Sequence, residues 1–242
     1  MSMETSQRVF VARNDPRRLM PSVGIYSHTR DRWGISYAQP MVLNDRQAGA
    51  AIEGVVRDER WETAQLAVDT HGYTDVAMAL ARGVGLDLCR RLKELSDRHL
   101  FVPRGSEIPE NLKGICHATI DPGRAARQWD AMVHLFASVH SGHSSAITVL
   151  ARYGSAARGD PLYEAMVQLG KLLRTVFLCD YFVNEAFRRE LLRVLNRGEA
   201  VNALKRAIYV GRVAKLPSQT ARGDAGRRGR AESVGEPGDR LE

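Results

Sequence analysis

The chain has 242 residues, of which 44 % are hydrophobic and 26 % are charged, and this balance excludes a wholly disordered or collagen-like protein. We find no apolar run of the roughly eighteen residues that a membrane span needs, and no secretory signal in residues 1–14, so we expect a cytoplasmic location. Lys and Arg number 35 against 28 Asp and Glu, a formal net charge of +7. This excess favours nucleic acid as a partner, but arginine excess also follows from a GC-rich genome, so charge alone decides nothing.

The first third of the chain has the pattern of short strands. Residues 8–12, 23–28 and 34–40 alternate apolar and polar side chains between turn-rich stretches, which predicts an antiparallel meander of three half-buried strands. We expect Asn44 to cap a helix that runs to about Val56. A short buried strand over residues 65–68, a helix from Thr74 to about Val84 and a strand over residues 85–89 follow.

The remainder of the chain has helical periodicity. We predict helices over residues 125–139, 144–153, 161–180, 184–195 and 199–210. Residues 217–242 contain almost no large apolar side chain, which predicts disorder because such a segment buries too little surface to offset its ordering entropy. We therefore expect one α/β domain over residues 1–212, with a mostly helical insertion at about 106–182 and a disordered basic tail over 213–242. The order of its first elements matches a ribonuclease-H-like fold: three antiparallel strands, a helix and a further strand.

Asp69 is the first candidate for chemistry, because it ends the apolar strand over residues 65–68. A carboxylate at the end of a buried strand is held rigidly at a sheet edge, where it can bind a metal ion. The alternative is a helix cap, for which Thr74 or Asp75 is at least as well placed.

Glu199 is the second candidate, and it stands in the run L-N-R-G-E at residues 195–199. We expect one helix to break at Gly198 and the next to begin with Glu199, where an acidic residue would also favour the helix dipole. Basic residues surround it and suit the phosphates of a nucleic acid, although a solvated helix face has the same pattern: Arg188, Arg189, Arg193, Arg197, Lys205, Arg206 and Arg212.

Cysteine and histidine spacing gives no sign of a zinc site. The three cysteines, Cys89, Cys116 and Cys179, are an odd number at wide spacings, which indicates reduced thiols rather than a disulfide framework. His134, His140 and His143 are separated by six and then three positions, and we interpret them as residues of helix faces.

Several runs, in a fixed order, resemble the catalytic region of transposases of replicative class II transposons, the Tn-three family. The resemblance extends from about Gln39 to Gly211, and ordered motifs over such a length are far more specific than one short signature. The runs are P-M-V-L-N-D-R-Q-A-G-A-A-I-E-G at 40–54, D-T-H-G-Y-T-D at 69–75, L-F-V-P-R-G at 100–105, W-D-A-M-V-H-L at 129–135, L-G-K-L-L-R-T at 169–175 and L-N-R-G-E at 195–199.

This resemblance implies a DDE strand transferase with a ribonuclease-H-like core and a helical insertion between the second Asp and the Glu. The second Asp of the family falls on Asp69 and its Glu on Glu199. The implied chemistry uses Mg²⁺ or Mn²⁺, held by three carboxylates, to cleave DNA and to transfer strands during DNA transposition and recombination. The implied partners are transposon-end and target DNA, with full-length transposase or a second copy of the chain. The resemblance also suggests that His71 orients the metal or touches DNA.

The sequence departs from the family at the first catalytic Asp. The family has an Asp-Gly pair before the first strand, where this chain has Thr5 and Ser6. Glu4 is one position away, and Asp15 follows the strand. Because catalytic carboxylates act as a unit, we expect a truncated fragment that is inactive alone.

Two further hypotheses remain open at this point. The chain can be a non-catalytic DNA-binding or regulatory protein, whose DNA affinity would be salt-sensitive and independent of metal. It can also be a pseudogene product with no selected role and no DNA affinity near physiological salt.

Overall fold

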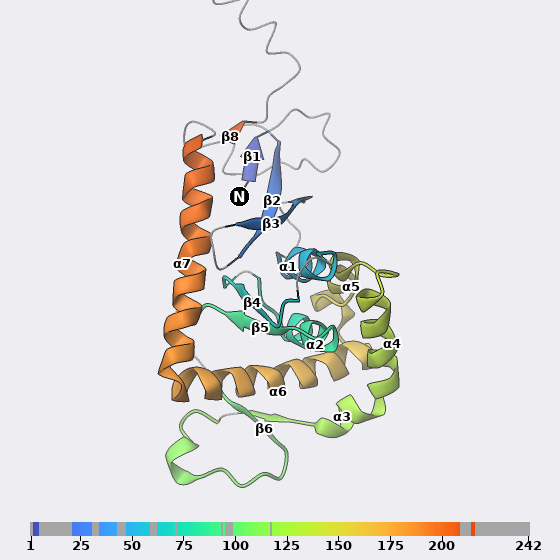
Figure 1. Ribbon diagram of the computed structural model, residues 1–242. Coiled ribbons are helices and arrows are strands. Elements are labelled where there is room, and N and C mark those ends of the chain that lie inside the picture. The colour runs from blue at the N-terminus through green and yellow to red at the C-terminus, as the bar shows by residue number, and fades with distance from the viewer. Residues whose placement is uncertain are drawn as a thin grey trace, which may run out of the picture.

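A computed structural model of the chain (Figure 1) describes residues 2–4, 21–30, 34–42, 47–58, 62–70, 72–92, 94, 99–116, 118–208 and 214–215. These residues form an α/β structure with seven α-helices and three small sheets. Within these ranges, none of the helices combines the length and the apolar character that a membrane crossing requires.

The first sheet is built on an antiparallel pair, as the alternating pattern predicts. Strands β2 (Ser22–Thr29) and β3 (Ile35–Met41) pair with Tyr26 opposite Gln39. Strand β1 (Ser2–Glu4) pairs antiparallel with β2, and β8 (Ala214–Lys215) pairs parallel with β1, which gives the order β3-β2-β1-β8. The strand predicted over residues 8–12 lies outside the described residues.

A separate parallel pair carries the first candidate residue. Strands β4 (Gln65–Val68) and β5 (Asp87–Arg90) are joined by α2 (Asp75–Gly83). Helix α2 begins after Thr74, whose Oγ1 accepts a 3.0 Å hydrogen bond from the Ala77 amide, so the predicted helix start is confirmed. The strand predicted over 85–89 begins two residues later, because Gly85 completes the turn after α2 with a positive φ of 88°.

The remaining elements are mostly helical, as predicted. Helix α1 spans Gln47–Val56, and Asn44, its predicted cap, lies outside the described residues. Strands β6 (Phe101–Pro103) and β7 (Ala118–Ile120) form a second parallel pair, and 3₁₀ turns occupy Glu110–Leu112 and Ser155–Ala157. The helices are α3 (Pro122–Arg127), α4 (Trp129–His140), α5 (Ala146–Arg152), α6 (Pro161–Val183) and α7 (Glu185–Ile208).

The predicted break at Gly198 is wrong, because α7 is one continuous helix through this residue. A glycine inside a helix costs only about 1 kcal/mol relative to alanine, and the buried residues Leu191, Leu195 and Val201 hold the helix against the body on both sides of it. A Cβ at Gly198 would lie 3.8 Å from the Thr29 Oγ1 at the end of β2.

The core is organised around α2, which lies between the β4–β5 pair and α6 (Figure 1). Helix α2 is buried over the whole run from Val76 to Ala81. The two helices approach closely at Gly170 of α6, where a Cβ would overlap the carbonyl group of Asp75. The glycine in the L-G-K-L-L-R-T run is therefore required by helix packing.

We expect Gly170→Ala to destabilise the fold by about 1–3 kcal/mol, because α6 must move away from α2 to admit the methyl group. Denaturant unfolding followed by circular dichroism measures this change. Gly114→Ala is the matched control, since nothing lies within 4 Å of a Cβ there. Equal stabilities of the two variants would contradict the packing argument.

His28 joins the first sheet to α1. The residue is 9 % exposed, its Nε2 donates a 2.8 Å hydrogen bond to the Ala51 carbonyl, and its ring occupies the space that a side chain at Gly54 would need. Burial lowers the pKa of His28 below its usual value, because the low-dielectric surroundings disfavour the charged ring.

This shift makes stability depend on pH. Since the folded ring stays neutral while the unfolded ring takes up a proton below its ordinary pKa of about 6.5, the contribution of His28 is present above that value and is lost as the pH falls. We expect the unfolding free energy of the parent chain to fall more steeply between pH 7 and pH 5 than that of His28→Gln. The difference between the two slopes is expected to be at most about 1.4 kcal/mol per pH unit. His134→Gln, at an exposed position, should keep the parent's slope, and identical slopes in all three proteins would refute this assignment.

Candidate active site

Asp69 lies at the carboxyl end of β4, at the position that the sequence predicts. Its residue is exposed, and its Oδ1 accepts a 3.1 Å hydrogen bond from the Gly72 amide. Burial, and secondly the Asp69 carboxylate, raise the pKa of the Tyr26 hydroxyl group in β2. A Cβ at Gly72 would lie 2.8 Å from the Val68 Cβ, which explains why the turn after Asp69 contains glycine.

Glu199 reaches the same region from α7, which runs beside β4 and the end of β2 (Figure 1). Its side chain is 68 % exposed, and its Oε1 lies 3.2 Å from Nη2 of Arg91. The same Nη2 donates a 3.1 Å hydrogen bond to Oδ1 of Asn196, one helical turn before Glu199.

Arg91 connects the two candidate acids. It directly follows β5, and its amide donates a 2.9 Å hydrogen bond to the carbonyl of Val68, the residue before Asp69. Arg91 is not among the site residues that the sequence predicts, although a basic residue directly after the second strand of a parallel pair is a visible signal. The structure therefore brings Asp69 and Glu199 to one edge of β4–β5, with a guanidinium group bound to Glu199.

The described residues do not complete a metal site. Carboxylate oxygens suit Mg²⁺ or Mn²⁺, but within the described ranges no three His, Cys, Asp or Glu side chains are placed to hold one ion. Glu4 is described only by its backbone in β1. Thr5, Ser6, Asp15 and His71 lie outside the described residues.

Comparison with known proteins identifies the family. Residues 1–228 match the family described as Tn3 transposase DDE domain. The chain belongs to the Tn3-type DDE transposase family. No solved structure matches it.

Three similar members of the family are transposases. The chain is 66 % identical over 224 residues to the transposase for insertion sequence element IS1071 in transposon Tn5271 of Comamonas testosteroni, covering 93 % of this chain and 23 % of the relative. It is 31 % identical over 198 residues to the transposase for transposon Tn1546 of Enterococcus faecium, and 27 % identical over 197 residues to that for Tn21 of Escherichia coli. Each of these two matches covers 81 % of this chain and 20 % of the relative. The chain thus spans about a fifth of the length of these transposases.

Residues from the runs at 69–75, 100–105 and 169–175 form a structural cluster around Arg174 of α6. Its Nη1 lies 3.1 Å from Oδ1 of Asp75, and its guanidinium lies 4.3 Å from the centre of the Phe101 ring. The Phe101 amide donates a 2.8 Å hydrogen bond to the Thr175 Oγ1, and the Tyr73 hydroxyl donates one of 2.8 Å to Asp75. These motif residues therefore fasten β6 and the start of α2 to α6.

The basic residues predicted to bind DNA lie along α7, and several have partners within the chain. Arg188 Nη1 donates 2.7 Å hydrogen bonds to the carbonyls of Tyr181 and Phe182, so it caps the end of α6. Arg189 pairs with Glu185 at 2.6 Å and Arg193 with Glu190 at 2.5 Å, all four well exposed. Arg197 also has an interaction, and partial burial lowers the pKa of Lys205. The side chain of Arg206 is not described.

The thiols are free, as predicted. Cys89 is buried, Cys179 is exposed, and Cys116 is intermediate. Burial, with a smaller effect of Asp87, raises the pKa of Cys89 to about 12, so it stays protonated at neutral pH. The three thiols therefore add nothing to the candidate site.

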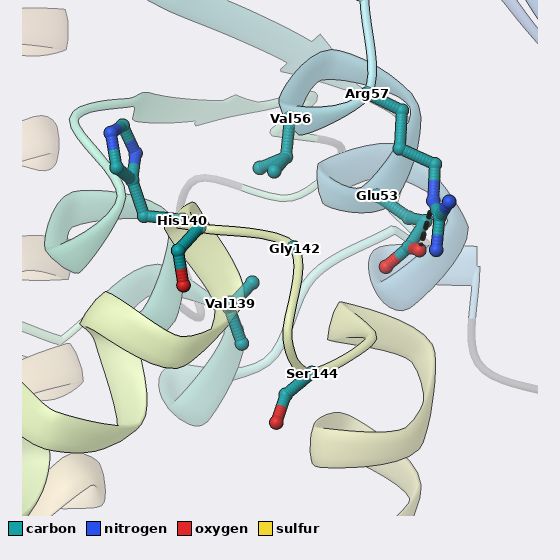
Figure 2. A pocket seen from close by; sticks show the side chains of 8 residues that line it. Glu53, Val56, Arg57, Val139, His140, Gly142 and Ser144 are labelled. Atoms are coloured by element: carbon teal, nitrogen blue, oxygen red, sulfur yellow. Dashed lines mark hydrogen bonds and ion pairs between the residues drawn. The ribbon is translucent and has the colours of Figure 1, made fainter.

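A small pocket lies elsewhere, between the end of α1 and the α4–α5 turn (Figure 2). Its buried acid, Glu53, accepts hydrogen bonds from the Ala146 amide at 2.6 Å, the Ser145 hydroxyl at 3.1 Å and the Arg57 Nε at 2.5 Å. These bonds satisfy the start of α5, so Glu53 is a structural residue that holds α5 against α1.

We expect Glu53→Ala to lower the unfolding free energy by about 2–3 kcal/mol, because a buried amide loses its charged acceptor. Thermal unfolding checks this value. Glu110→Ala is the control, since Glu110 is 85 % exposed and its side chain pairs with Lys113 on the protein surface. A loss no greater than that of the control would contradict the structural role.

Proposed function

We propose that this chain acts in DNA transposition as the catalytic segment of a DDE transposase, with Asp69 and Glu199 as two of its three carboxylates. The observation that carries this proposal is their convergence. Two acids far apart in the sequence lie at one edge of β4–β5, connected through the Arg91 backbone and side chain.

We further propose that the described strands are parts of a ribonuclease-H-like core. The antiparallel strands β1, β2 and β3, followed by α1 and the parallel pair β4–β5, have the element order that such a core requires. Helices α3 to α6 then stand between β5 and the helix that carries Glu199, as an insertion does in this arrangement.

The proposed reaction is cleavage of DNA and transfer of its strands, with Mg²⁺ or Mn²⁺ as the cofactor of the complete site. Asp69 and Glu199 would supply oxygen ligands to this ion. Thr5 and Ser6 stand where the family has its first catalytic Asp and the following Gly, and loss of one member of a joint catalytic unit removes most of the rate. We propose that the chain by itself binds the metal weakly and does not cleave DNA.

The proposed partner is DNA at the bacterial nucleoid, together with a full-length transposase or a second copy of this chain. On α7, the exposed ion pairs of Arg189 and Arg193 are of the weak surface type, so these side chains can exchange their carboxylates for phosphates. Arg197, Lys205 and Arg206 extend the same helix toward Ile208. Arg188 is assigned to the α6 cap rather than to DNA.

We expect Thr5→Asp to restore an acidic ligand and to tighten Mn²⁺ binding at least tenfold, because a third carboxylate adds a charged oxygen donor. Isothermal titration of MnCl₂ into the full chain measures the affinity. Adding Asp69→Ala to Thr5→Asp should abolish the gain, whereas adding Asp87→Ala, an exposed acid at the opposite end of the strand pair, should not.

An absence of Mn²⁺ binding in the Thr5→Asp chain would contradict the proposal that the catalytic metal site lies at the carboxyl end of β4–β5. Salt-sensitive DNA binding without any metal effect would then favour a non-catalytic DNA-binding or regulatory role. A chain with no DNA affinity at low salt would contradict both.

A further inference from the structure

Arg91 and Glu199 differ in how firmly the protein holds them. The Arg91 side chain is only 21 % exposed, while that of Glu199 is 68 % exposed. The Arg91 backbone is fixed to β4 through the Val68 carbonyl. The guanidinium is therefore the fixed member of the ion pair, and the carboxylate is the member that has space to turn away.

Asn196 gives Arg91 a second contact on α7. Asn196 and Glu199 are three residues apart and share one face of the helix, and Nη2 of Arg91 reaches both, at 3.1 Å and 3.2 Å. If Glu199 leaves, the bond to Asn196 still connects α7 to the end of β5. The Arg91 side chain thus docks α7 through its bond to Asn196 and neutralises Glu199 through a separate ion pair.

We propose that Arg91 is a positioning residue that neutralises Glu199 in the metal-free site and that a divalent cation must displace it from Glu199. This inference rests on the proposed function, in which Glu199 is a metal ligand. The Arg91 guanidinium and the metal ion compete for the Glu199 carboxylate, since an oxygen already bound to a guanidinium is a poorer ligand for a metal. Arg91 thereby holds Glu199 at the carboxyl end of β4–β5 before the metal arrives, at a cost in metal affinity.

The test uses the full chain carrying Thr5→Asp, so that binding is strong enough to measure. Adding Arg91→Gln, which removes the charge but keeps a polar side chain, should tighten Mn²⁺ binding about two- to fivefold, the range expected for release of an exposed ion pair. Adding Arg82→Gln is the matched control, because Arg82 forms an exposed 2.6 Å ion pair with Asp87 at the other end of β5. This control should leave the affinity unchanged. Titration calorimetry gives the affinities, and circular dichroism verifies folding.

A second measurement does not depend on the fold of the Arg91→Gln variant. The Nε–H signal of Arg91 in an NMR spectrum, identified by its loss in Arg91→Lys, should shift as Mg²⁺ saturates the Thr5→Asp chain. Displacement also requires the guanidinium protons to exchange faster with water, whereas an arginine that stays bound to Glu199 would keep its slow exchange, and that result would overturn the displacement.

The outcomes separate this inference from the proposed function. Asp69-dependent Mn²⁺ binding that is equally tight with and without Arg91 would overturn the displacement, while the proposed function stands. Weaker binding in Arg91→Gln would also overturn it, because Arg91 would then only support the site. An absence of metal binding in both the Thr5→Asp chain and its Arg91→Gln derivative would overturn both proposals.

Discussion

The hydrogen bond from the Arg91 amide to the Val68 carbonyl, together with the Arg91 side chain on α7, is the constraint on which the candidate site depends. The bond closes the carboxyl end of β4–β5 next to Asp69. The guanidinium then attaches α7 to this edge, because it contacts Asn196 and Glu199 on one helix face. The buried side chains of Leu191, Leu195 and Val201 hold α7 against the body, and the contacts of Arg91 add a polar attachment at the turn that carries Glu199.

The second constraint is the close packing of α2 on α6. Gly170 permits the contact, and Arg174 secures it through Asp75 and the Phe101 ring. Since α2 connects β4 to β5, this packing fixes the strand pair from the side opposite α7 (Figure 1). The family motifs at residues 69–75, 100–105 and 169–175 are therefore largely motifs of architecture, with Asp69 as the member that faces the candidate site.

Local patterns predicted the elements well where one interaction decides them. The apolar run before Asp69 became β4, and Thr74 caps α2 by a single hydrogen bond. The prediction of a helix break at Gly198 was wrong because tertiary packing along α7 outweighs the low helix propensity of one glycine. The partnership of Arg91 with Glu199 was not predictable from periodicity, since it joins residues more than a hundred positions apart through a helix rotation. The arginines of α7 were visible as a basic run, but only the fold shows that Arg188 caps α6.

The most direct measurement of the central claim is a distance between the β4 edge and α7. Spin labels at Thr70→Cys and Ala203→Cys, in a chain with Cys116 and Cys179 replaced by serine, leave Asp69, Arg91 and Glu199 intact. Pulsed electron paramagnetic resonance should give one narrow distance distribution, and the additional change Arg91→Ala should broaden it. A broad distribution in the chain that keeps Arg91, or a narrow one that does not respond to its loss, would contradict the docking of α7 by this arginine.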